Sequence, residues 1–149
     1  MRDDSPPECR IADECLAGRV RVLNRVVTGI CDDALRPHKV RISQISIVVA
    51  IAAAGPVRAT DVCRLLKLDK STLSRDLDRL LARRLVRATP AEGRTKDLEA
   101  TDAGRALIAK VMPAWEIAQE RVRDILGTAL TKGIFDAASR LQAADSDQS

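Results

Sequence analysis

The stretch Asp69-Lys-Ser-Thr-Leu-Ser-Arg-Asp-Leu-Asp-Arg-Leu80 decides the fold. Its leucines recur every three to four residues, a spacing that predicts one buried face of a helix extending to about residue 83. Asp69 can accept hydrogen bonds from the free amide groups of the first turn. The opposite face carries hydroxyl and cationic side chains, namely Ser71, Ser74, Arg75, Asp78 and Arg79. A helix that opens with small hydroxyl residues and carries arginines behind them suits the grooves of duplex DNA.

The flanking segments predict a helix-turn-helix followed by a hairpin. Residues 60–67 form a short helix whose apolar residues are Val62, Leu65 and Leu66. Two short alternating segments, 85–89 and 96–100, enclose the turn-rich linker 90–95, a pattern typical of a β-hairpin. The prediction is a winged helix-turn-helix over residues 42–101, which is mostly α with a small β wing.

Longer helices are predicted on both sides of this region. Apolar residues at helical spacing predict a helix over 13–36, and the segment 42–54, apolar on nearly every face, predicts a core helix. A long helix from 102, with Pro113 inside it, ends at Gly127 and is followed by a last helix to 143. Residues 1–10 and 145–149 are expected to be flexible, so that 11–144 form a single unit.

Positive charge is concentrated in one third of the chain. From Arg58 to Lys96 there are 11 Lys/Arg and 5 Asp/Glu, a net charge of +6, so the remainder carries −2 of the total +4. Such clustering indicates a polyanionic partner, although a solvated charged face is the alternative. The segment contains no aromatic residue, whereas single-stranded nucleic acids are usually bound by aromatic stacking. Double-stranded DNA therefore fits better.

Other classes of protein fit poorly. We find no nucleophile–base set, glycine-rich phosphate loop or paired metal ligands, so neither an enzyme nor a cofactor is expected. The four cysteines lack zinc-ligand spacing. No apolar run is long enough to cross a bilayer, and the N-terminus lacks the apolar core of a secretory signal. A cytoplasmic protein without membrane association is expected.

The order of these segments resembles the MarR (multiple antibiotic resistance regulator) family of bacterial transcription factors. The similar stretches run from about Cys15 to Gly127, and four of them stand in order at the family's spacing. They are Ala59–Leu68, Asp69–Leu80, Leu85-Val-Arg87, and Glu92-Gly-Arg94 followed by Leu98 and Thr101-Asp-Ala-Gly104. Lys67 and Arg84 depart from the pattern, because the family often has glycine there. If the backbone is left-handed at these positions, a side chain costs about 1 kcal/mol.

The resemblance implies that the helix from Asp69 enters the major groove and that Arg94, at the wing tip, enters the minor groove. Glu92 could hold Arg94 in place through a two-pronged ion pair. For Arg79, a surface ion pair with Asp76 or Asp78 is the alternative to DNA contact. Helix capping is the alternative for the hydroxyl residues. The expected DNA-binding residues are Lys70, Ser71, Thr72, Ser74, Arg75, Arg79, Arg94 and Lys96.

The resemblance further implies a homodimer. The apolar stripes of helices 13–36 and 102–143 are too wide to be buried by a small winged domain alone, so we expect two chains to interlock. The expected dimerisation residues are Leu16, Val20, Leu23, Trp115, Val122, Phe135 and Leu141. Such a dimer would act as a repressor on a pseudo-palindromic operator, released by a small aromatic or phenolic effector.

Two alternatives remain open. Peroxide-sensing members of the family keep a reactive cysteine close to the position of Cys15, and Cys9 could act as its resolving partner. In those members tyrosines polarise the thiol, and this chain has none. The second alternative is a winged-helix module that binds protein, which would require an apolar outer face on the helix over 70–83.

Overall fold

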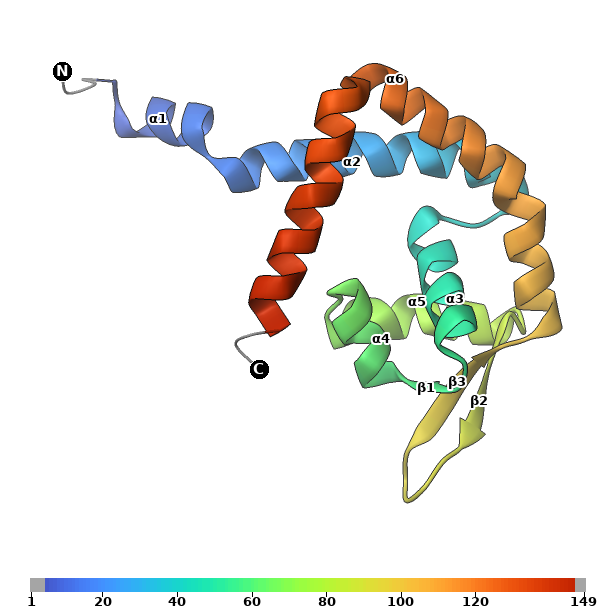
Figure 1. Cartoon of the computed structure of the whole chain (residues 1–149). Coiled ribbons are helices and arrows are strands. Elements are labelled where there is room, and N and C mark those ends of the chain that lie inside the picture. The colour runs from blue at the N-terminus through green and yellow to red at the C-terminus, as the bar shows by residue number, and fades with distance from the viewer. Residues whose placement is uncertain (1–4, 147–149) are drawn as a thin grey trace.

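The computed structural model describes residues 5–146 and has the predicted class of fold, mostly α with a small antiparallel sheet. In Figure 1, α2 and the middle of α6 lie on one side, and α3, α4, α5 and the sheet lie on the other. The elements are α1 (Pro7–Glu14), α2 (Leu16–Leu35), the 3₁₀ helix η1 (Arg36–His38), α3 (Ile42–Ala54), β1 (Val57–Arg58), α4 (Ala59–Leu66), α5 (Lys70–Ala82), β2 (Val86–Pro90), β3 (Lys96–Ala100) and α6 (Asp102–Ser146).

The helix α3 forms the centre of the winged-helix core, as its composition predicts. Its residues Ile47, Val48 and Ile51 are fully buried. Around them pack side chains from the neighbouring helices and strands, namely Val62, Leu73, Leu80, Leu85, Val86 and Leu98. This cluster fixes the positions of α4, α5 and the wing relative to one another, because close-packed interiors leave side chains little freedom.

The sheet has three strands in the order β1-β3-β2, all antiparallel. The pairing of β2 and β3 runs from Val86 opposite Ala100 to Pro90 opposite Lys96, which confirms the hairpin. The sequence pattern does not predict the strand β1. It has only two residues, which is too short to show an alternating pattern.

The N-terminal helix differs from the prediction. The apolar spacing predicts a single helix from residue 13, whereas the structure has α1 and α2 separated at Cys15, whose φ of −72° and ψ of 105° are extended. Part of the stretch expected to be flexible is therefore helical. Pro7 stands in the first turn, where its missing amide costs nothing, and Arg10 pairs with Glu14 one turn later. The expectation for residues 1–4 lies outside the described residues.

The C-terminal helix changes direction where predicted. At Gly127 φ is 72° and ψ is 168°, so the backbone is not helical there, and the last part of α6 turns to cross α2 in the view of Figure 1. The last helix continues to Ser146, a few residues beyond the expected end. The rest of the expected flexible tail, residues 147–149, lies outside the described part of the chain.

The wing joins α6 through Thr101 and Gly104. The Thr101 amide donates to the Leu85 carbonyl oxygen at 3.1 Å, and the Thr101 hydroxyl donates to the Arg84 carbonyl at 2.7 Å. The same hydroxyl oxygen accepts from the Gly104 amide at 3.0 Å and so caps α6. A Cβ atom on Gly104 would lie 2.1 Å from the Leu85 carbonyl oxygen, so only glycine allows this approach.

We therefore predict that Gly104→Ala destabilises the protein by about 1–3 kcal/mol or more, because backbone must move to admit the methyl group. Urea denaturation would measure the change. Gly133→Ala is the matched control, since a Cβ atom there meets nothing within 4 Å and the helix gains up to about 1 kcal/mol. Equal stability of the two variants would contradict the close packing at Gly104.

Candidate nucleic-acid interface

The helix α5, which the resemblance implies is the DNA-recognition helix, begins with a capping carboxylate, as predicted. Asp69 Oδ1 accepts from the Thr72 amide at 2.8 Å and from the Ser71 hydroxyl at 2.6 Å. Asp69 Oδ2 accepts from the Thr72 hydroxyl at 2.7 Å. The hydrogen bonds from Ser71 and Thr72 hold the pKa of Asp69 well below its usual range, so this side chain is ionised at neutral pH.

This cap changes the expected roles of the hydroxyl residues. A hydroxyl group has a single proton, and those of Ser71 and Thr72 are donated to Asp69. Phosphate oxygens only accept hydrogen bonds, so neither hydroxyl can also donate to a phosphate while the cap is intact. The carboxylate also occupies the first-turn amide of Thr72. In this structure the two residues cap the helix, which is the alternative expectation for them.

Cationic side chains remain available on the outer face of α5. Lys70, Ser74 and Arg75 are exposed, and the Arg75 Nε donates only to the Ser71 carbonyl oxygen, at 3.5 Å. Arg79 is exposed too, but its Nη1 lies 3.7 Å from Asp76 Oδ1, the ion pair considered as an alternative to DNA contact. The outer face is therefore cationic and hydroxylated, not apolar.

Each of the two helices α4 and α5 is followed by a left-handed residue. The φ angles are 52° at Lys67 and 56° at Arg84, as the departures from glycine suggest. Each follows a helix in the Schellman arrangement. The Leu68 amide donates to the Cys63 carbonyl, and the Leu85 amide donates to the Leu80 carbonyl, both at 2.9 Å. The backbone adopts the turn despite the side chains.

The wing places Arg94 and Lys96 at its exposed tip. Gly93 has φ of 75°, the Ala91 amide donates to the Thr95 carbonyl, and the Thr95 hydroxyl donates to the Glu92 carbonyl at 2.7 Å. Within residues 5–146 the expected ion pair between Glu92 and Arg94 is not formed. Further up the wing, Arg87 Nε donates to Glu99 Oε2 at 2.7 Å across the strands.

The sequence pattern does not predict a buried polar pair formed by Asp76 and Gln44. From the sequence, Asp76 is expected only as a surface partner of Arg79. In the structure Asp76 is 9% exposed and lies on the same face of α5 as Leu73 and Leu80. Gln44 on α3, 7% exposed, donates from Nε2 to Asp76 Oδ1 at 3.3 Å. The spacing of three residues from Leu73 and four to Leu80 is the available signal, since it puts Asp76 on the apolar stripe.

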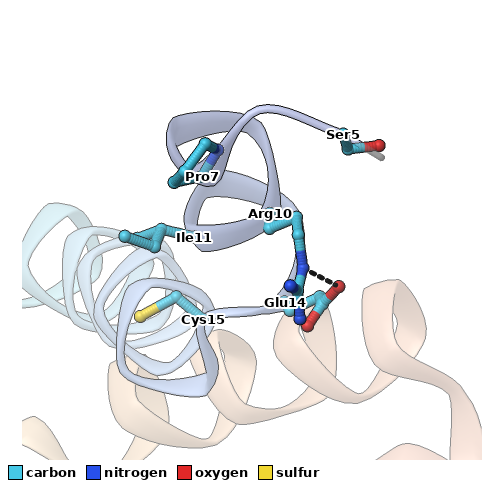
Figure 2. Close-up of a pocket in the computed structure, with 6 residues that line it drawn as sticks. All are labelled: Ser5, Pro7, Arg10, Ile11, Glu14 and Cys15. Atoms are coloured by element: carbon cyan, nitrogen blue, oxygen red, sulfur yellow. Dashed lines mark ion pairs between the residues drawn. The ribbon is translucent and has the colours of Figure 1, made fainter. Parts of the chain in front are cut away.

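The cysteines occupy different environments. Cys15 caps α2, where its Sγ accepts from the Gly18 amide at 3.4 Å. Figure 2 shows this sulfur beside a surface pocket and pointing away from the Arg10–Glu14 ion pair. Cys9 is exposed on α1. Cys31 is buried, and burial, followed by the charge of Asp32, raises the pKa of its thiol.

Several of the expected dimerisation residues are exposed in the single chain. The exposed fractions are 80% for Leu16, 62% for Val20, 64% for Phe135 and 72% for Leu141. Leu23 and Trp115 are half-buried, whereas Val122 is buried. A groove of about 320 Å³ between α2 and α6 is lined by Val20, Leu23, Asn24, Val27, Gln119, Val122, Arg123, Leu126, Thr131, Ile134 and Phe135.

Comparison with known proteins agrees with the resemblance to the MarR family. The sequence profile of the MarR family matches residues 38–95. Among solved structures, the transcriptional regulator MosR of M. tuberculosis in complex with DNA is 26% identical, with a TM-score of 0.75, and the match covers 91% of this chain and 99% of that one. The chain is therefore similar to the MarR family over residues 38–95, and most of it shares the fold of solved transcriptional regulators.

Two further structures share the MarR fold with lower identity. A mutant of E. coli MarR, complexed with operator DNA, is 16% identical with a TM-score of 0.77, covering 88% of this chain and 96% of that one. CouR from Rhodococcus jostii RHA1, bound to p-coumaroyl-CoA, is 23% identical with a TM-score of 0.74, covering 89% and 94%. No curated protein sequence matches the chain.

This similarity supports a transcriptional regulator with a winged DNA-binding fold, since the matched proteins are regulators and not enzymes. No helix among the described residues is long and apolar enough to span a membrane. Over the same part of the chain, no group of three His, Cys, Asp or Glu residues could hold a metal ion.

Proposed function

We propose that the chain is a homodimeric repressor that binds a pseudo-palindromic DNA operator and is released by a small effector. The observation that carries the proposal is the exposed cationic face of α5, on a helix that is capped at Asp69 and packed against α3. The DNA-bound forms of MosR and E. coli MarR support it, since both have this fold.

In the proposed complex, long cationic side chains do most of the contacting. Because Asp69 occupies the first turn of α5, the helix start is a poor phosphate site, and Lys70 and Arg75 supply the positive charge there. Arg75 can donate two hydrogen bonds to a guanine edge. Ser74 is exposed, and its hydroxyl has no partner within residues 5–146, so it can donate to DNA. Arg94 on the wing reaches the minor groove, where narrow A·T-rich sequence concentrates negative potential.

A second copy of the chain is the proposed cover for the apolar surface of α2 and α6. The surface combines the exposed Leu16, Val20, Phe135 and Leu141 with the groove between the helices. Thr131 Oγ1 is buried beside this groove without a hydrogen-bond partner among the described residues. Two chains joined here would present two recognition helices to half-sites about one DNA turn apart.

The proposed effector site lies where α2, η1 and α3 meet. A cavity of about 570 Å³ there is lined by Asp32, Arg36, Lys39, Val40, Arg41 and Gln44. Its three cationic side chains suit the carboxylate or phenolate of a small aromatic acid. CouR, a structural relative, is bound to p-coumaroyl-CoA. An effector in this cavity would lie beside the N-terminus of α3, which contacts the recognition helix.

Selection of bound duplexes from a random pool tests the proposal. We expect an inverted repeat with half-site centres about 10 base pairs apart, because two recognition helices must enter successive major grooves. Recovery of no preferred sequence, or of a single half-site only, would contradict a dimeric regulator.

We predict that Arg94→Ala weakens binding to every duplex and lowers the slope of log affinity against log salt by about 1, since one phosphate-proximal cation is lost. A fluorescence titration at several salt concentrations measures both quantities. Arg25→Ala, an exposed cation on α2 far from the wing, is the control and should leave the slope unchanged. An unchanged slope in Arg94→Ala would remove the wing from the interface.

We predict that Phe135→Asp dissociates the dimer, because a charge would be placed in the apolar contact. Sedimentation equilibrium should show a monomer that retains the helical content of the wild type. Asp136→Asn, at the neighbouring position outside the apolar stripe, should remain dimeric. A dimeric Phe135→Asp protein would place the interface elsewhere.

Redox sensing through Cys15 is a second candidate function, favoured by the position of its sulfur, which lines a surface pocket at the start of α2 and accepts a hydrogen bond from the Gly18 amide. The thiolate would attack an organic hydroperoxide, release the alcohol and become a sulfenic acid. The Cys9 thiol would then displace water to form a disulfide. Six positions along a helix separate the two residues by about 9 Å, more than a disulfide allows, so α1 would have to unwind.

We predict from this candidate that organic hydroperoxide lowers the DNA affinity of the wild type, whereas Cys15→Ser is insensitive. Gel-shift titration before and after treatment measures the change, and mass spectrometry identifies the oxidised residue. Equal affinity of the treated and untreated wild type would eliminate the redox function without affecting DNA binding.

A further inference from the structure

The buried pair of Gln44 and Asp76 joins the recognition helix to the start of α3. Asp76 takes a place between Leu73 and Leu80 on the face of α5 that packs on the core. An apolar residue would fill this place without the cost of burying a carboxylate. A charged group at such a position therefore calls for a role that packing alone does not explain.

Both polar atoms of the Gln44 side-chain amide form hydrogen bonds. Its Oε1 accepts from the Arg41 amide at 3.2 Å, which caps α3, and its Nε2 donates to Asp76 Oδ1 at 3.3 Å. The cap settles which way the amide points, so that a donor faces α5. Asp76 is the acceptor for that donor, and the same oxygen lies 3.7 Å from Arg79 Nη1.

We propose that Asp76 is a positioning residue, which through Gln44 sets the rotation of α5 about its own axis and so aims Lys70 and Arg75 at the base edges. The contacts of Leu73 and Leu80 hold α5 against the core, but they are not directional and so fix its rotation less sharply than a hydrogen bond does. A hydrogen bond from a side chain fixed by its own cap is directional. This inference rests on the proposed function, and it assigns the discrimination between sequences to a contact that never touches DNA.

The pair lies next to the cavity proposed for the effector, since Gln44 and Arg41 also line that cavity. A ligand that moves the N-terminus of α3 would move the Gln44 donor, and α5 would lose the hydrogen bond that sets its rotation. The same contact thus links the cavity to the aim of the recognition helix.

A reciprocal exchange of donor and acceptor tests the inference. Gln44→Glu keeps an acceptor for the Arg41 amide but turns a second carboxylate oxygen toward Asp76. Adding Asp76→Asn restores a donor–acceptor pair in the opposite direction. The measured quantity is the ratio of the affinity for the selected operator to the affinity for a random duplex, determined at one salt concentration.

We expect Gln44→Glu to lower this ratio by at least about tenfold, the effect of losing one specific base contact, and the double variant to recover most of it. Asp76→Leu is the second variant, because leucine occupies the buried position but cannot accept from Gln44, and it should lower the ratio. Thermal unfolding of all variants separates a loss of stability from a change in the orientation of α5.

An unchanged ratio in Asp76→Leu, or a double variant no better than Gln44→Glu alone, would overturn the inference while the wild type still selects its operator. A wild-type chain that prefers no duplex would instead overturn the proposed function, and the inference with it.

Discussion

The close approach of Gly104 to the Leu85 carbonyl is the constraint on which the DNA-binding half of the molecule depends. It brings the first turn of α6 against the turn between α5 and β2, and Thr101 ties the two together through the carbonyls of Arg84 and Leu85. The end of the recognition helix, the start of the wing and the start of the long C-terminal helix therefore meet at one point. A shift of α6 is transmitted to both of the elements proposed to touch DNA.

The start of the recognition helix is organised differently. Asp69 satisfies the first turn of α5 and holds the two neighbouring hydroxyl groups, which gives the helix a well-defined beginning. A helix start without such a carboxylate would attract phosphate directly. Here a negative charge takes that place, so the attraction has to come from cations further along the helix and on the wing. Binding then depends on side-chain reach and less on the helix dipole.

Sequence patterns predict the elements that repeat over several residues. The leucine spacing predicts α5, the uniformly apolar run predicts α3, and the turn-rich linker predicts the hairpin. Features that depend on a single contact cannot be predicted in this way. The strand β1 exists only through its pairing with β3, in which Val57 lies opposite Leu98 and Arg58 opposite Asp97. The break before α2 depends on the conformation of Cys15. Helical spacing places Asp76 on the apolar stripe, but it cannot show that Gln44 on α3 offers the donor for the buried carboxylate. From the sequence, the pattern Thr101-x-x-Gly104 is known only through the family resemblance. The structure gives its physical reason, which is the close approach of Gly104 to the Leu85 carbonyl.

The residues with left-handed backbone outside glycine are all basic among those the structure describes: Lys39, Lys67 and Arg84. Each follows the C-terminal end of a helical segment, where the carbonyl dipoles favour a positive charge. Glycine would relax the backbone at all three positions but would remove three cations from a molecule whose proposed partner is a polyanion. The basic side chains make the left-handed backbone less favourable, but they add long-range attraction to a polyanion. If this protein were selected only for thermal stability, we would expect these three basic residues to be replaced first. Its association with DNA would then be slower, because long-range electrostatic attraction would be weaker.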